Sequence, residues 1–138
     1  MDRVNRFHTK ETWLWVRAEH VGAVLVLSTM AALHARELDW GRFAAAFVLI
    51  DLVGYVPGAI AFSRAGGRPI SPVYHHLYNF THNYLTAAVA VAVWAAAIGH
   101  CEWAMLALPI HLSGDRGIFG NTYKPVSLPF EPADPRGQ

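Results

Sequence analysis

The run FAAAFVLIDLVGYVPGAI, residues 43–60, decides which class of fold this chain can adopt. It carries a single charged residue, Asp51, among side chains that are otherwise apolar or small. An acid near the middle of a bilayer costs about 2.5 kcal/mol or more unless it faces partners or water. We therefore expect Asp51 to point into a bundle of helices, where it marks a polar site.

The composition of the whole chain predicts a membrane protein. Of its 138 residues, 54% are hydrophobic and only 15% are charged, which is too apolar for a soluble domain of this size. A hydrocarbon core about 30 Å thick needs about 20 residues per helix. We predict an all-α fold, a four-helix transmembrane bundle with spans near residues 13–34, 40–62, 74–98 and 103–112.

The last predicted span and the end of the chain have features of their own. The fourth span is short, so it must gain turns at its ends, tilt, or pack inside the bundle instead of against lipid. Residues 1–124 are expected to form the transmembrane domain. Residues 125–138 contain four prolines and read as an extended Pro-rich tail.

The orientation follows from the basic residues. Nine of the 11 Lys and Arg residues fall on one side of the four-span arrangement: Arg3, Arg6, Lys10, Arg17, Arg64, Arg68, Arg116, Lys124 and Arg136. Arg36 and Arg42 fall on the other side. The positive-inside rule then places both termini in the cytoplasm. We expect a multi-pass protein of the inner membrane.

This topology brings ionisable groups from all four predicted spans to a similar depth. They are Glu19 in the first, Asp51 in the second, the histidines of residues 75–82 in the third, and His111 with Asp115 at the end of the fourth. At about 1.5 Å per residue, all of them can lie in the cytoplasmic half of the membrane.

The spacing of the polar residues suggests a metal site. His111 and Asp115 are four residues apart and share a helix face, and imidazole with carboxylate is a common ligand pair for Zn²⁺ or another first-row divalent ion. In the third span, two neighbouring stripes carry polar residues, namely His75, Asn79 and His82 on one, and His76, Asn79 and Asn83 on the other. The alternative is structural: histidines can pack within a bundle, Glu19 can pair with Arg17, and Asp115 with Arg116 or Arg17.

Several motifs carry a resemblance to known proteins. Asp51-Leu52-Val53-Gly54-Tyr55, the segment from His76 to Asn83, and the segment from His111 to Gly117 resemble, in this order, an uncharacterised family of small four-span bacterial membrane proteins. Arg17-Ala18-Glu19 is similar to the start of that family's first helix. The resemblance covers roughly residues 13 to 125.

That pattern is in turn distantly similar to membrane-bound metal-dependent hydrolases. The resemblance implies metal ligation by Asp51, by His82 in the pair Thr81-His82, and by His111 with Asp115. The chain departs from the pattern after His76, where Leu77 and Tyr78 replace the Arg and Gly common in that group, and at Asn83, where Ser is common.

Two functions of different classes follow. In the first, the protein is a membrane metalloenzyme that hydrolyses an ester or phosphoester of a lipid-like substrate at the cytoplasmic leaflet, with Glu19 as general base or further ligand. Arg116 or Lys124 would hold an anionic head group. In the second, the protein is a non-catalytic membrane subunit, in which His82 or His76 with His111 binds haem or the polar residues lock helices together.

Other classes find no support in the sequence. The net charge of +1 gives no reason to expect nucleic acid, and Cys101 is the one cysteine, so an intrachain disulfide is excluded. The sequence shows no Walker-type phosphate loop and no dinucleotide motif in the right context. A homo-oligomer or a larger membrane complex stays open.

Overall fold

The computed structural model of the chain describes residues 9–131, and that part is helical, without strands. The predicted all-α class is thereby confirmed. The α-helices are α1 (Lys10–Leu33), α2 (Trp40–Gly54), α3 (Val56–Arg64), α4 (Pro72–Thr81), α5 (Tyr84–Ile98) and α6 (Ala107–Gly114). A 3₁₀ turn, Trp103–Leu106, precedes α6, and a π-helical turn, Asp115–Phe119, follows it.

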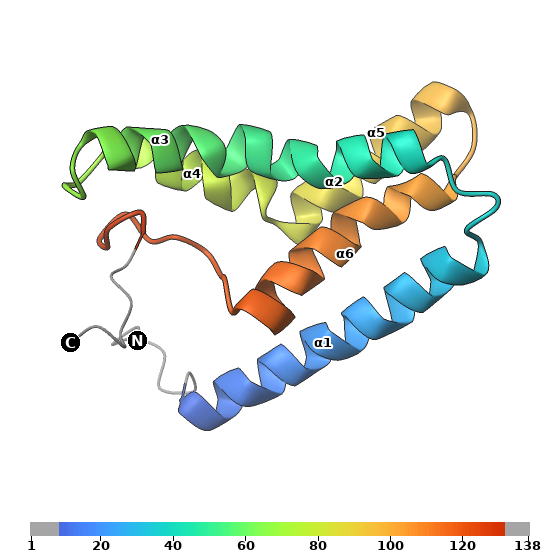
Figure 1. Cartoon of the computed structure of the whole chain (residues 1–138), viewed down its shortest axis with the longest axis horizontal. Helices are drawn as coiled ribbons and strands as arrows, with labels where there is room; N and C mark the ends of the chain where they lie inside the picture. The colour runs from blue at the N-terminus through green and yellow to red at the C-terminus, as the bar shows by residue number, and fades with distance from the viewer. Residues whose placement is uncertain (1–8, 132–138) are drawn as a thin grey trace.

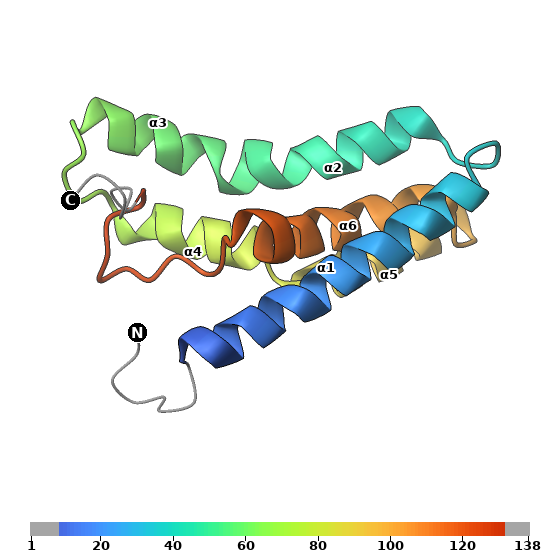
Figure 2. The ribbon, with the colours of Figure 1, turned by 60° about the horizontal axis from the view of Figure 1, so that its bottom comes forward.

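The helices run back and forth along the long axis of the molecule (Figures 1 and 2). The first, α1, runs one way, α2 and α3 return, α4 and α5 lead out again, and α6 turns back toward the starting end. Around α6 lie α1, α2 and α5, all of which pack against it. Its Leu112 and Ser113 are each 1% exposed, so this short helix is the centre of the fold.

Fewer helices than predicted are long and apolar enough to cross a membrane. Lys10–Leu33 and Trp40–Arg64 qualify, and the bent pair Pro72–Thr81 with Tyr84–Ile98 makes a third if it is one span. Within residues 9–131 the count is therefore two or three where we expected four. The expected fourth span, 103–112, is instead a 3₁₀ turn and a short helix buried among the others, because it has too few apolar residues to face lipid along its length.

The third predicted span is broken, whereas the sequence suggested one helix over 74–98. α4 and α5 meet at His82 and Asn83 with a bend of 58°. Side chains compete with the backbone there: Thr81 Oγ1 donates to carbonyls of the preceding turn, and Asn83 Oδ1 accepts from the backbone N–H of Leu85, capping α5. The polar residues that suggested a site thus also end a helix.

At the far end of the molecule, the loop between α1 and α2 meets the loop between α5 and α6. The rings of His34 and Trp103 stack with centroids 3.7 Å apart, and Trp103 Nε1 donates to Glu37 at 3.1 Å. The hydrogen bonds from His34 and then Trp103 hold the pKa of the Glu37 carboxyl below its usual value. Arg42 and Glu102 form an ion pair at 2.9 Å beside them.

The described end of the chain folds back onto α3 and α4. Phe130 is 1% exposed, and a Cβ atom on Gly58 would overlap its ring, so glycine is needed for this contact. Packed structure therefore extends beyond the predicted domain boundary at 124. Residues 132–138 of the predicted tail lie outside the described residues.

Candidate metal centre

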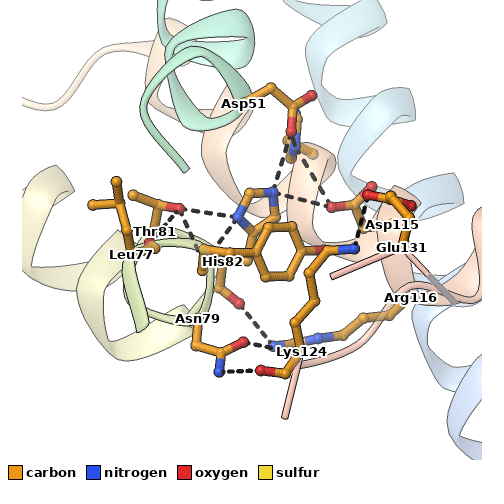
Figure 3. Close-up of polar contacts among 11 residues, drawn as sticks. Asp51, Leu77, Asn79, Thr81, His82, Asp115, Arg116, Lys124 and Glu131 are labelled. Atoms are coloured by element: carbon orange, nitrogen blue, oxygen red, sulfur yellow. Dashed lines mark hydrogen bonds and ion pairs between the residues drawn. The ribbon is translucent and has the colours of Figure 1, made fainter. Parts of the chain in front are cut away.

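Four side chains converge into one cluster, here called the His-Asp ring: Asp51 on α2, His82 at the end of α4, His111 on α6 and Asp115 at the start of the π-helical turn. Figure 3 shows Asp51, His82 and Asp115. His82 Nε2 lies 3.2 Å from Asp51 Oδ1 and 3.4 Å from Asp115 Oδ2. His111 Nε2 lies 3.6 Å from the same Asp51 oxygen and 3.7 Å from the same Asp115 oxygen. Nitrogen and oxygen donors therefore alternate around the ring, and each imidazole faces both carboxylates.

These distances suit a metal ion. Donor atoms bound at about 2.0–2.2 Å to a tetrahedral ion lie about 3.3–3.6 Å from one another, close to the four separations in the ring. Donor atoms of Asp51, His82 and His111 all lie within 4.8 Å of one another. Asp115 Oδ2 also lies near both Nε2 atoms, but Asp115 falls outside the group of donors that lie within 4.8 Å of one another. Two imidazoles and two carboxylates are ligands typical of zinc and other first-row ions.

His82 is held in the orientation that a ligand needs. Its Nδ1 lies 3.1 Å from the Tyr78 carbonyl oxygen and 3.0 Å from Thr81 Oγ1, which leaves Nε2 directed at the carboxylates. The Tyr78 ring stacks on the imidazole with centroids 3.9 Å apart. A metal-binding histidine usually has its second nitrogen fixed in this way.

The surroundings of His111 give the strongest reason to expect a bound proton or cation in the ring. The His111 side chain is 5% exposed, and within residues 9–131 neither ring nitrogen has a hydrogen-bond partner. Buried polar groups are nearly always paired, so an unpaired imidazole between two carboxylates calls for a proton or a cation in the ring. An ion bound to Nε2 would satisfy that nitrogen.

Haem does not fit the same residues. In axial ligation by two histidines, the porphyrin plane passes between the two imidazoles. Here Asp51 and Asp115 lie between them, each near both Nε2 atoms. Two carboxylates in that position would also repel an anionic porphyrin.

The ring opens on one side into a polar cavity of about 290 Å³. The two histidine side chains are 5% exposed, but Asp51 is 45% exposed and lines this cavity together with Asp115. Tyr55, Tyr78, Lys124 and Glu131 also line it. A small molecule entering the cavity would therefore meet the two carboxylates of the ring.

Lys124 brings a positive charge to the cavity. Its Nζ donates to the Phe130 carbonyl at 2.6 Å and to Glu131 at 3.2 Å, and it lies over the rings of Tyr78 and Phe130. Asn79 holds the backbone of Lys124 in place with two hydrogen bonds, one in each direction. Asn79 is thus a positioning residue one step away from the ring.

Arg116 and Asn83 support the ring without entering it. Arg116 Nη2 donates to the His82 carbonyl at 3.0 Å, and its guanidinium lies over the ring of Tyr84. Asn83 donates to the Tyr123 hydroxyl in addition to capping α5. The expected pairing of Arg17 with an acid is replaced by hydrogen bonds from Arg17 to the carbonyls of Gly117 and Ile118.

Three residues expected at the site lie elsewhere. Glu19 is exposed on α1, where His20 is the neighbour that turns inward, toward the Tyr84 hydroxyl at 3.3 Å. His76 is exposed on α4. His75 is buried, but its ring packs edge-on against Phe130. The break at His82 explains part of this, because His75 and His82 share a stripe only on an unbroken helix.

Tyr78 and Glu131 are among the residues of the site that the sequence did not predict. Tyr78 precedes His82 by four residues, or about one helical turn. That spacing could have indicated a contact between the two side chains. Glu131 follows a Pro-rich stretch that reads as an extended tail, and no local pattern reports that Phe130 anchors it.

Comparison of the chain with protein-family models, with curated proteins and with solved structures gives no match.

Proposed function

We propose that this chain is an integral membrane metalloenzyme in which Asp51, His82, His111 and Asp115 hold a divalent ion. Its reaction would be hydrolysis of an ester or phosphoester of a lipid-like substrate at the cytoplasmic leaflet. The observation that supports it best is the His-Asp ring, whose two buried imidazoles face the same two carboxylates and whose His111 nitrogens have no hydrogen-bond partner among residues 9–131.

The residues around the ring have separate tasks in this proposal. When bound, the ion would polarise the scissile group and lower the pKa of a water molecule. Asp51, the most exposed member of the ring, would accept a proton from the cavity side. Lys124 has three N–H donors, of which two go to Phe130 and Glu131, so one is left for an anionic oxygen of the substrate.

In this proposal the general base is a carboxylate of the ring or of its cavity, in place of Glu19. Glu19 lies exposed on α1, whereas the carboxylates that line the cavity within residues 9–131 are Asp51, Asp115 and Glu131. A base must reach the proton that it removes, directly or through one water molecule.

The proposed orientation has both termini in the cytoplasm of a cell with an inner membrane. The start of α1, the end of α3 and the segment after the π-helical turn lie at the same end of the molecule in Figure 1, and Lys10, Arg64 and Lys124 belong to these segments. Arg42 lies at the opposite end, at the start of α2. The basic residues thus gather at the end toward which the polar cavity lies.

A second candidate is a non-catalytic membrane subunit. Protonated His82 and His111 would balance the charges of Asp51 and Asp115, and the ring would then lock α2, α4 and α6 together as a structural ion-pair network. The metal content of the protein decides between the two candidates.

The test is metal analysis of the detergent-purified protein beside His82→Ala and Asp115→Asn, with His76→Ala as a matched control on the exposed face of α4. We expect stoichiometric metal in the parent and in His76→Ala, and a sharp loss in the two ring variants. Metal in the parent at the level of His82→Ala would refute the metal site and leave the structural ring.

A further inference from the structure

A second, apolar cavity of about 300 Å³ lies between α2 and α5. Ala46 and Val53 on α2 form one wall, Ala90 and Trp94 on α5 form the other, and Leu108 on α6 is the floor. We call this cavity the α2–α5 groove. Its lining is almost wholly apolar, and Val53 and Ala90 are exposed at its mouth, on two segments apolar enough to lie in a membrane.

The bend at His82 creates this groove. α2 packs closely against α4, but beyond the 58° bend α5 diverges from α2, and the two helices meet mainly through α6 beneath them. Small side chains along the groove, including Ala46 and Ala90, leave the space unfilled. The break that brings His82 into the ring therefore also opens the α2–α5 groove beside it.

The groove and the ring use neighbouring residues of the chain. Ile50 lines the groove and Asp51 belongs to the ring, while Thr81 lines the groove and His82 belongs to the ring. Asp51 also lines the polar cavity, together with Lys124 and Glu131. The ring therefore shares a residue with the polar cavity and is next in the chain to the groove, which matches the order of head group, ester linkage and chain in a lipid.

We infer that the α2–α5 groove binds the acyl chain of the lipid-like substrate and places its ester or phosphoester group at the ring. This inference rests on the proposed function. The occupant we assign is a single hydrocarbon chain, because the lining is almost wholly apolar and the groove lies between two segments that are apolar enough to lie in a membrane. Such a chain can enter from the surrounding lipid.

The groove would raise the reaction rate by positioning the substrate more than by strengthening its binding. Lipid tails are as apolar as the groove, so leaving the bilayer brings a chain little hydrophobic gain. Holding the chain in one place does fix the linkage relative to the ring, and a misplacement of about 1 Å can cost about a hundredfold in rate. We therefore expect the enzyme to prefer long-chain substrates over short-chain ones with the same head group.

The first test uses Ala90→Phe, which fills the groove, and Ala88→Phe, which adds the same ring to an exposed position of α5 outside the groove. In metal-loaded protein, Ala90→Phe should lower the ratio of long-chain to short-chain phospholipid turnover by about tenfold or more. Ala88→Phe should leave that ratio unchanged. Equal ratios in the two variants would refute the groove.

The second test needs no turnover. Trp94 lines the groove, so a phospholipid with bromine in its acyl chain, titrated into the detergent-solubilised protein, should quench the Trp94 component of fluorescence in a saturable way. A Trp94→Phe variant defines that component. We expect saturable quenching in the parent and in Ala88→Phe, and its loss in Ala90→Phe.

The two tests separate the groove from the proposed function. Saturable quenching without hydrolysis of any ester would keep the groove as a lipid site and overturn the enzyme. Hydrolysis with a chain-length ratio and quenching that Ala90→Phe leaves unchanged would keep the enzyme and overturn the groove.

Discussion

Gly54 on α2 and Thr81 on α4 are in direct contact: a Cβ atom added to Gly54 would overlap the Thr81 hydroxyl and come within 3.1 Å of the His82 imidazole. Asp51 lies one turn before Gly54, so this contact sets the distance between Asp51 and His82. The ring depends on a glycine whose lack of a side chain leaves room for the Thr81 hydroxyl and the His82 imidazole.

Gly54→Ala should therefore disturb the ring while leaving the helical content intact. Overpacking at a close helix contact costs about 1–3 kcal/mol in the free energy of unfolding. We expect a lower melting temperature and reduced bound metal. The control is Gly22→Ala on α1, where an added Cβ meets nothing within 4 Å, so this change should be neutral or slightly stabilising. Identical stability and metal content in both variants would contradict the role of Gly54.

The ring should behave as one unit in double variants. If His82→Ala already releases the ion, adding Asp115→Asn should change metal content little, because ligands of one site act non-additively. Metal content measured for the two single variants and the double variant checks this. Additive losses, with residual metal in each single variant, would point to two separate ions.

Glu19→Gln should have little effect. The side chain is exposed on α1, so removal of its charge leaves no buried partner unpaired. Melting temperature, metal content and turnover should all match the parent. Loss of turnover at unchanged metal content would return Glu19 to the catalytic group and require α1 to move toward the ring.

Phe130 should stabilise the folded end of the chain and keep Lys124 in the cavity. Phe130→Ala removes a ring that is 1% exposed and packs beside Tyr55 and His75, a change that costs about 3–5 kcal/mol. Leu128, 55% exposed, is the control, and Leu128→Ala should be nearly silent. Thermal unfolding of both variants decides the matter, and equal melting temperatures would show that the Phe130 contact adds no stability.

Reporter fusions at the two ends test the proposed topology. Because nine of the 11 Lys and Arg residues fall on one side of the arrangement, both ends should report a cytoplasmic location. Reporters on opposite sides of the membrane would require an odd number of spans, as when α6 does not complete a crossing.

Much of the site could be predicted from single residues and short spacings. Asp51 stands alone in an apolar run, and His111 with Asp115 lies on one helix face, so local sequence singled out three of the four ring members and the motif around Thr81-His82 added the fourth. Glu19, His75 and His76 were equally plausible by the same reasoning. Which side of a helix a residue shows to its neighbours depends on where that helix ends and how it packs, and the pattern of polar residues does not encode this directly.

The sequence by itself determined that the chain is helical and apolar enough for a membrane, because composition and the length of apolar runs act locally and need no partner. Only the tertiary structure decided that the third apolar segment breaks at His82, that α6 is buried at the centre, and that Phe130 brings Glu131 to the cavity. The side chains of Thr81 and Asn83 favour the break locally, but the packing of the broken segment against α2 and the other two features come from contacts between distant residues, such as Gly54 with Thr81 and Gly58 with Phe130. Such contacts form only when the helices pack, since each needs a close approach that neither residue specifies alone.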